Sequence, residues 1–205
     1  MFLLNVSALF VLVLLTGCDG GGDAQTTNNT TTQTVTNTST QSVQEECVPI
    51  GGVVEQKRRE IDVNGVTRAY TLSVSEVKPG VEMPMLIAIN GAEGNDYPFP
   101  QQTSFEALAA SEGVILVRPE SDLLPPNEGE WILNTTAIST RDIDFMKAMI
   151  ADIATGYCVD FKRIYATGYS LGSMFNYELV CHMSDYFAAV ASHAGSMPVQ
   201  MDSCP

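Results

Sequence analysis

The chain has 205 residues, of which 45% are hydrophobic, and a formal net charge of -14 at pH 7. A surface this acidic repels phosphate groups, which excludes nucleic acids and anionic lipid surfaces as binding partners. The part of the chain that follows residue 46 has the length of one domain and enough apolar residues for a core of its own.

Residues 1–17 form an apolar segment that is too short to span a bilayer and is typical of a signal peptide. The segment ends in Leu15-Thr16-Gly17-Cys18, which resembles a bacterial lipobox. That resemblance implies cleavage before Cys18, diacylation of this residue, and attachment to a membrane through Cys18 only. An ordinary cleaved signal peptide or a wrongly assigned start stays open, because no Lys or Arg precedes the apolar core.

Residues 18–46 are rich in Gly, Thr, Asn, Gln and Ser and contain hardly any aliphatic side chains. Such a segment cannot bury enough apolar surface to offset the entropy lost on ordering, so we expect a flexible linker. The sequence therefore predicts a signal peptide over 1–17, this linker over 18–46, and a single domain over 47–205 without internal repeats.

The start of the domain predicts an antiparallel hairpin within Val53–Ser75, because two runs rich in β-formers flank Asn64-Gly65, which favours a type I′ turn. Short apolar strands then alternate with segments of helical periodicity. The predicted strands are Pro84–Asn90, Val114–Val117, Arg163–Thr167 and Phe187–Ala194, and the predicted helices are Ser104–Glu112, Arg141–Thr155 and Leu171–His182. This alternation is typical of a mostly parallel α/β sheet that is covered on both faces.

A G-x-S-x-G sequence, Gly168-Tyr169-Ser170-Leu171-Gly172, joins a predicted strand directly to a predicted helix. In this context the pattern indicates a nucleophile elbow, a sharp turn that presents the Ser170 hydroxyl above the sheet. The alternative is an ordinary strand-to-helix turn that happens to contain serine.

Two backbone amides are candidates for an oxyanion hole beside Ser170. The N–H of Leu171 lies at the start of the predicted helix and points toward the place where the oxyanion would form. A second donor is expected from the loop after Pro84–Asn90, and the N–H of Ala92 is the best candidate there.

Four cysteines remain beside Cys18, namely Cys47, Cys158, Cys181 and Cys204. In an exported protein an even number favours two disulfides, for which three connectivities are possible. No C-x-x-C or H-x-x-x-H spacing accompanies them, so we expect neither a metal site nor a cofactor.

Several segments follow one another in a characteristic order: Arg68-Ala69-Tyr70, Asn90-Gly91, Val117-Arg118-Pro119-Glu120, Trp131, Asp142-Ile143-Asp144-Phe145, Val159–Tyr165, the Ser170 pentapeptide, and Phe187–Ala191. In this order they resemble the exported polyhydroxybutyrate depolymerase and feruloyl esterase family of α/β-hydrolases. The resemblance covers Arg68–Pro205 and implies a mostly parallel sheet with an antiparallel N-terminal hairpin. It also implies the disulfide pairs Cys181–Cys204 and Cys47–Cys158.

The activity implied by this resemblance is that of a serine carboxylic ester hydrolase, in which Ser170 attacks the ester carbonyl. The implied substrates are feruloyl or acetyl esters of plant polysaccharide, or a polyester, hydrolysed outside the cytoplasm. An alternative of another class is a catalytically inactive surface lipoprotein that keeps the hydrolase scaffold for binding.

Two features depart from the family pattern. Asn90 stands where the family usually has histidine, which changes side-chain hydrogen bonding near the oxyanion loop and leaves the backbone donors in place. The family's catalytic acid and histidine lie beyond the position that corresponds to Pro205, so we expect a truncated sequence. The sheet is then expected to be incomplete at its C-terminal edge, with Phe187–Ala194 as an exposed apolar strand.

The two histidines of the chain are expected to be structural. His182 ends the helix that follows Ser170, where the helix dipole favours a histidine, and should point away from the site. His193 ends a strand, but the usual chain order of serine, acid, histidine leaves no acid in the expected place between Ser170 and His193. Trp131 could stack on a sugar or aromatic ring of a substrate, although a role in packing is the expected one.

Overall fold

The computed structural model describes residues 55–77, 80–92, 104–121, 129–133, 140–197 and 204. All of them belong to one compact unit, Gln44–Pro205. The predicted signal peptide, the lipid-modified Cys18, the linker and Cys47 lie outside the described residues and stay predictions. Within the described part of the chain, no helix is both long enough and apolar enough to cross a membrane.

The predicted hairpin is confirmed, with β1 over Glu55–Val63 and β2 over Val66–Val74 in antiparallel register. Asn64 and Gly65 connect the two strands with φ angles of 55° and 81°. Positive φ at both central positions is the requirement of a type I′ turn, whose twist matches that of the flanking strands. The Asn-Gly dipeptide therefore fixes the register of the first two strands.

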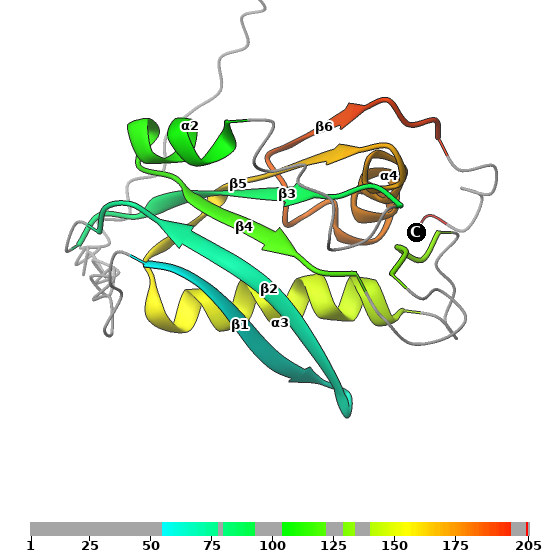
Figure 1. Ribbon diagram of the computed structural model, residues 1–205, viewed down its shortest axis with the longest axis horizontal. Helices are drawn as coiled ribbons and strands as arrows, with labels where there is room; N and C mark the ends of the chain where they lie inside the picture. Colours follow the sequence, from blue (N-terminus) through cyan, green and yellow to red (C-terminus); the bar gives the residue numbers. More distant parts are fainter. Residues whose placement is uncertain are drawn as a thin grey trace, which may run out of the picture. The chain divides into compact units, whose positions relative to one another are not determined.

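Six strands form one sheet in the order β1-β2-β4-β3-β5-β6 (Figure 1). The four further strands are β3 (Met83–Ile89), β4 (Ile115–Pro119), β5 (Val159–Tyr169) and β6 (Ala189–His193). These four are mutually parallel, whereas β2 pairs with β4 in antiparallel orientation. The predicted architecture, a mostly parallel sheet that begins with an antiparallel hairpin, is thus confirmed.

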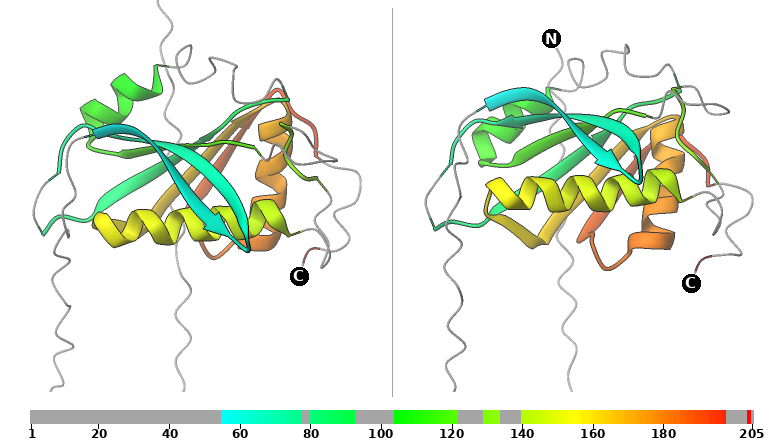
Figure 2. Two further views of the ribbon diagram at one scale, coloured as in Figure 1. Left: turned by 60° about the horizontal axis from the view of Figure 1, so that its bottom comes forward. Right: turned by 90° about the horizontal axis from the view of Figure 1, so that it is seen from below.

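In the described part of the chain, α2 (Phe105–Glu112) covers one face of the sheet, and α3 (Arg141–Gly156) and α4 (Leu171–Met183) cover the other (Figure 2). The main core lies between the sheet and the pair α3 and α4, and a smaller core lies under α2. On α3 the predicted apolar face is buried, with Ile143, Met146, Ile150 and Ile153 all at 3% exposure or less. Burial of this stripe holds α3 against the sheet.

Predicted strand boundaries differ from the observed ones by one to four residues, and two strand starts differ by two residues or more. β5 begins at Val159 and not at Arg163, because the N–H of Met83 bonds to the carbonyl of Cys158 (2.7 Å) and Met83 pairs with Val159. β6 begins at Ala189 and not at Phe187, because its pairing with β5 begins at Ala189, opposite Tyr165. Four of the five β6 residues are exposed, and β6 is the last strand of the described sheet.

A buried ion pair connects the hairpin to the start of α3. Arg68 lies 2.8 Å from Asp142, and their side chains are only 3% and 1% exposed. The guanidinium of Arg68 also lies 4.1 Å from the centre of the Phe145 ring and donates to the carbonyl of Glu120 (3.3 Å). A buried charge is tolerated because these partners replace the water that it has lost.

Asp142→Asn is expected to lower the free energy of unfolding by about 3 kcal/mol, because the buried Arg68 charge loses its counterion. The matched control is Asp160→Asn, which breaks the more exposed pair with Arg163 (2.6 Å) and should cost less than about 1 kcal/mol. Urea unfolding of both variants measures the difference. Equal losses in the free energy of unfolding would contradict a larger contribution of the buried pair to stability.

Candidate active site

Ser170 is the single residue between the end of β5 at Tyr169 and the start of α4 at Leu171. Its backbone angles are φ 51° and ψ -118°, a combination that residues with a side chain rarely adopt. Such strain is retained only where the surrounding structure enforces it, and it is concentrated at functional sites. The turn is tighter than predicted, because β5 continues through Gly168 to Tyr169 and does not end at Thr167.

Close backbone packing explains both glycines of the pentapeptide. A Cβ atom on Gly168 would lie 2.2 Å from the carbonyl oxygen of Gly172. A Cβ atom on Gly172 would lie 2.4 Å from the carbonyl oxygen of Asn90, at the end of β3. No real Cβ atom approaches a backbone oxygen so closely, so the elbow can form only with glycine at these two positions.

The backbone on both sides of Ser170 is fixed by hydrogen bonds. Its N–H donates to the carbonyl of His193 at the end of β6 (2.9 Å), and its own carbonyl accepts from the N–H of Met174 (3.0 Å). The segment after β6 also lies close to the backbone of Ser170: a Cβ atom on Gly195 would be 2.6 Å from the Ser170 carbonyl oxygen. Ser170 itself is half-buried, so the serine is held rigidly and is still open to solvent.

The loop after β3 lies directly beside Ser170, as predicted for an oxyanion loop. A Cβ atom on Gly91 would be 3.3 Å from the Cβ of Ser170 and 3.4 Å from the carbonyl oxygen of Tyr169. Ala92, the next residue, is exposed. Glycine at position 91 therefore allows the two backbones to approach, which brings the peptide that carries the Ala92 N–H close to Ser170.

Leu171 contributes the other predicted donor from the first turn of α4. The first amides of a helix have no acceptor within the helix, and they lie at the positive end of its dipole. Since Ser170 immediately precedes this turn, a negatively charged oxygen formed on a substrate at Ser170 would meet the N–H of Leu171. Ser170, Leu171 and the Gly91-Ala92 loop thus lie beside one another, as the predicted acyl-transfer site requires, and their roles stay predictions.

Asn90 is buried at 7% exposure, and its side-chain amide donates to the carbonyl of Gly91 (3.1 Å). Its own backbone carbonyl accepts a hydrogen bond from the indole N–H of Trp131 (3.0 Å). Nothing in the amino-acid sequence indicates this contact, which joins two residues 41 positions apart.

Trp131 is a packing residue and not a surface for substrate. It is 2% exposed, and its ring stacks on Phe175 of α4 with ring centres 4.9 Å apart. A ring so buried cannot contact a sugar or an aromatic ligand. The role in packing that we expected for Trp131 is confirmed.

The two histidines lie on different sides of the elbow. His182 is in the last turn of α4, where its Nε2 is 3.6 Å from the carboxylate of the buried Glu178. His193 is exposed, and its ring lies 5.8 Å from that of Tyr169. Only His193 is next to Ser170, and it contacts the serine through its backbone carbonyl.

The structure contains a disulfide between Cys181 in α4 and Cys204. Cys158 is also disulfide-bonded, while its predicted partner Cys47 lies outside the described residues. Disulfides persist in oxidising compartments, so they fit an exported protein. Over the described ranges, no cluster of three or more His, Cys, Asp or Glu side chains is placed to hold a metal ion.

Several proteins named as esterases are similar to this chain in amino-acid sequence. NocK of Nocardia uniformis subsp. tsuyamanensis, which is named as an esterase, is 31% identical over 147 residues, or 68% of this chain and 41% of that protein. The bifunctional acetylxylan esterase/xylanase of Neocallimastix patriciarum is 28% identical over 55% of this chain and 16% of its own length. Feruloyl esterase B of Piromyces equi is 27% identical over 54% of this chain and 20% of its own length. The chain thus spans less than half the length of these curated relatives.

The fold also occurs among solved structures. The acetyl xylan esterase from Aspergillus awamori superimposes with a TM-score of 0.58 at 17% identity, over 69% of this chain and 53% of that one. The fold of the described sheet and helices is therefore that of the α/β-hydrolases. No protein-family model matches the chain.

Proposed function

We propose, from the premise that this chain is related to esterases with the α/β-hydrolase fold, that it is a serine carboxylic ester hydrolase acting outside the cytoplasm. The observation that carries the proposal is the strained conformation of Ser170, with φ 51° and ψ -118° between β5 and α4. A function at the serine would account for a strained turn that needs two glycines and a close contact with the β3 loop.

The reaction proposed is acyl transfer in two steps. The Ser170 Oγ attacks the ester carbonyl, and the tetrahedral oxyanion accepts hydrogen bonds from the N–H groups of Leu171 and Ala92. The C–O bond to the alcohol then breaks, which leaves an acyl group on Ser170. Water hydrolyses this acyl-enzyme and releases the acid.

Activation of Ser170 requires a base that takes its proton, and in this mechanism the base is an imidazole. We retain the expectation that neither His182 nor His193 is this base. His182 is held near Glu178 in the last turn of α4, and His193 contacts Ser170 only through its carbonyl.

His193→Ala and His182→Ala are therefore expected to change kcat/KM for ester hydrolysis by less than about tenfold, because neither imidazole is the base. Alanine keeps the carbonyl that accepts the Ser170 N–H, so the elbow stays intact in the first variant. Steady-state kinetics of the full-length protein measure the effect. A loss of about a thousandfold or more in His193→Ala, with the fold retained, would make His193 the base.

The proposed substrates are acetyl or feruloyl esters of plant polysaccharide. Relatives named for acetylxylan and feruloyl esters support this choice, and an ester of a neutral polysaccharide suits a chain with a net charge of -14. A polyhydroxyalkanoate-type polyester is the alternative substrate. A lipid-modified Cys18 followed by the linker over 18–46 would hold the domain away from a membrane and leave it free to reach a polymer.

A panel of three substrates tests this proposal with the full-length protein: acetylated xylo-oligosaccharides, methyl ferulate and 3-hydroxybutyrate oligomers. We expect the highest kcat/KM for one of the first two. Rates at background for all three, from protein with a cooperative unfolding transition, would contradict the esterase. Binding of xylan without hydrolysis would instead favour the inactive scaffold.

A further inference from the structure

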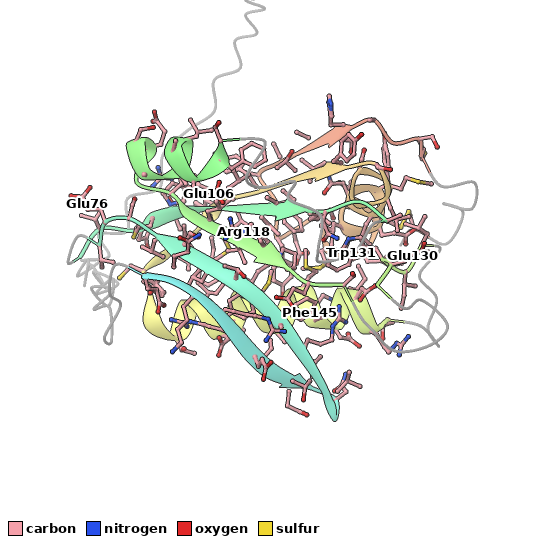
Figure 3. All side chains as sticks on the ribbon, viewed as in Figure 1. Glu76, Glu106, Arg118, Glu130, Trp131 and Phe145 are labelled. Carbon is pink, nitrogen blue, oxygen red and sulfur yellow. A yellow bond between two sulfur atoms is a disulfide. The ribbon has the colours of Figure 1, made fainter. Side chains whose placement is uncertain are left out.

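Trp131 lies at the end of the sheet where α4 begins (Figure 3), and it contacts both sides of the proposed oxyanion hole. Its indole N–H donates to the carbonyl of Asn90, which directly precedes Gly91. Its ring stacks on Phe175 of α4, the helix whose first turn supplies the N–H of Leu171. One buried side chain therefore joins the loop to the helix.

The hydrogen bond from Trp131 fixes the plane of the peptide between Asn90 and Gly91. Because a carbonyl has a preferred direction for its donor, holding the Asn90 oxygen restricts rotation of this peptide. The same oxygen is packed against Gly172, where a Cβ atom would lie only 2.4 Å away. The next peptide along the loop carries the N–H of Ala92. Its carbonyl, that of Gly91, accepts from the Asn90 side chain (3.1 Å), so its direction depends on Asn90, whose backbone carbonyl Trp131 holds.

The segment that carries Trp131 is itself fixed from the other side. The N–H of Ile132 donates to Asp142 (2.7 Å), at the start of α3. Asp142 in turn forms the buried pair with Arg68 at 2.8 Å. Trp131 is thus attached to a part of the fold that does not move with the loop, as a positioning group requires.

We propose that Trp131 is a positioning residue for ester hydrolysis: its indole N–H sets the direction of the Ala92 donor, and its ring sets the distance between this loop and the first turn of α4. The inference rests on the proposed function, since it assigns Trp131 to the oxyanion hole of Ser170. Trp131 touches no substrate, because its side chain is buried.

Trp131→Phe in the full-length protein is the direct test, because phenylalanine keeps an aromatic ring against Phe175 and removes the donor together with part of the buried indole. We expect kcat to fall about 10- to 100-fold with KM unchanged within about threefold, since the oxyanion forms in the transition state and not in the bound substrate. Amide hydrogen exchange should become about tenfold faster in peptides that contain Gly91 and Ala92.

Tyr157→Phe is the matched control. It also removes one donor from an aromatic residue of the main core, the hydroxyl that bonds to Glu55 (2.6 Å), and it does not involve Ser170 or its loops. Its kcat and its exchange at Gly91 and Ala92 should equal those of the wild type. The same losses in this control would show a general effect on the core and would overturn the proposal.

The two measurements separate the positioning role from the esterase activity. If the wild type hydrolyses no ester, the proposed function fails, and hydrogen exchange alone still decides whether Trp131 holds the loop. Unchanged kcat and unchanged exchange in Trp131→Phe, or a rise in KM alone, would overturn the positioning role. If Trp131→Phe does not fold, Phe175→Leu is measured in its place, because it keeps the indole donor and removes the stacked ring. An unchanged kcat in Phe175→Leu would overturn the role of the stacked Trp131 ring.

Discussion

Ser170→Ala is expected to reduce kcat/KM for ester hydrolysis by about 10⁴-fold or more, because in the proposed mechanism it removes the atom that forms the acyl-enzyme. The fold should be retained, since Ser170 is half-buried and its hydrogen bonds to His193 and Met174 use backbone atoms. The measurement is steady-state hydrolysis of p-nitrophenyl acetate and methyl ferulate, with thermal unfolding of the same samples.

The matched control is Ser173→Ala, one turn further along α4. Ser173 is fully buried, and its hydroxyl has no hydrogen-bond partner in the described part of the chain. Loss of this hydroxyl should change kcat/KM by less than about threefold, because it removes no interaction that the reaction uses. Equal kcat/KM values for the Ser170→Ala and Ser173→Ala proteins would show that Ser170 is not the nucleophile.

Gly168→Ala is expected to destabilise the domain by more than about 4 kcal/mol, a large part of the stability of a typical domain. The added Cβ would lie 2.2 Å from the carbonyl oxygen and 2.4 Å from the carbonyl carbon of Gly172. These are backbone atoms of α4, so no side chain can rotate to make room, and either the elbow must open or the helix must shift.

Gly156→Ala is the control for this substitution. Gly156 ends α3, and a Cβ atom there has no atom within 4 Å. Alanine at this position should be neutral or stabilising by up to about 1 kcal/mol, because it lowers the entropy of the unfolded chain and favours the helix. Guanidinium unfolding of both proteins provides the comparison. Similar unfolding midpoints would show that the elbow tolerates a side chain and is not strained.

Local patterns were sufficient to predict most of the fold. Asn64-Gly65 determined the hairpin, and the apolar face of α3 was readable from the spacing of Ile143, Met146, Ile150 and Ile153. The order of strands and helices together with the segments around Ser170 indicated an α/β-hydrolase, and the relatives and the solved structure agree with this. The glycines of the pentapeptide predicted the sharp turn at Ser170 because the turn can form only without side chains beside it.

The contacts that hold the site were not predictable, because they join residues that are distant in the sequence. Nothing near Trp131 indicates that its indole bonds to Asn90, and nothing near Arg68 indicates that its partner is Asp142. Strand ends were misjudged for the same reason, since pairing with Met83 and not local propensity determines where β5 begins. The roles of Leu171 and Ala92 stay predictions, as do the lipid at Cys18 and the identity of the ester.

Covalent labelling tests the central claim, that Ser170 is an activated nucleophile, most directly. A fluorophosphonate that mimics the tetrahedral intermediate is added to the folded full-length protein, and the adduct is located by peptide mass spectrometry. We expect a single stoichiometric adduct on Ser170, and none after unfolding in guanidinium, because reactivity depends on the oxyanion donors and the base. No adduct on Ser170 of the folded protein, or an adduct on another serine, would contradict this account.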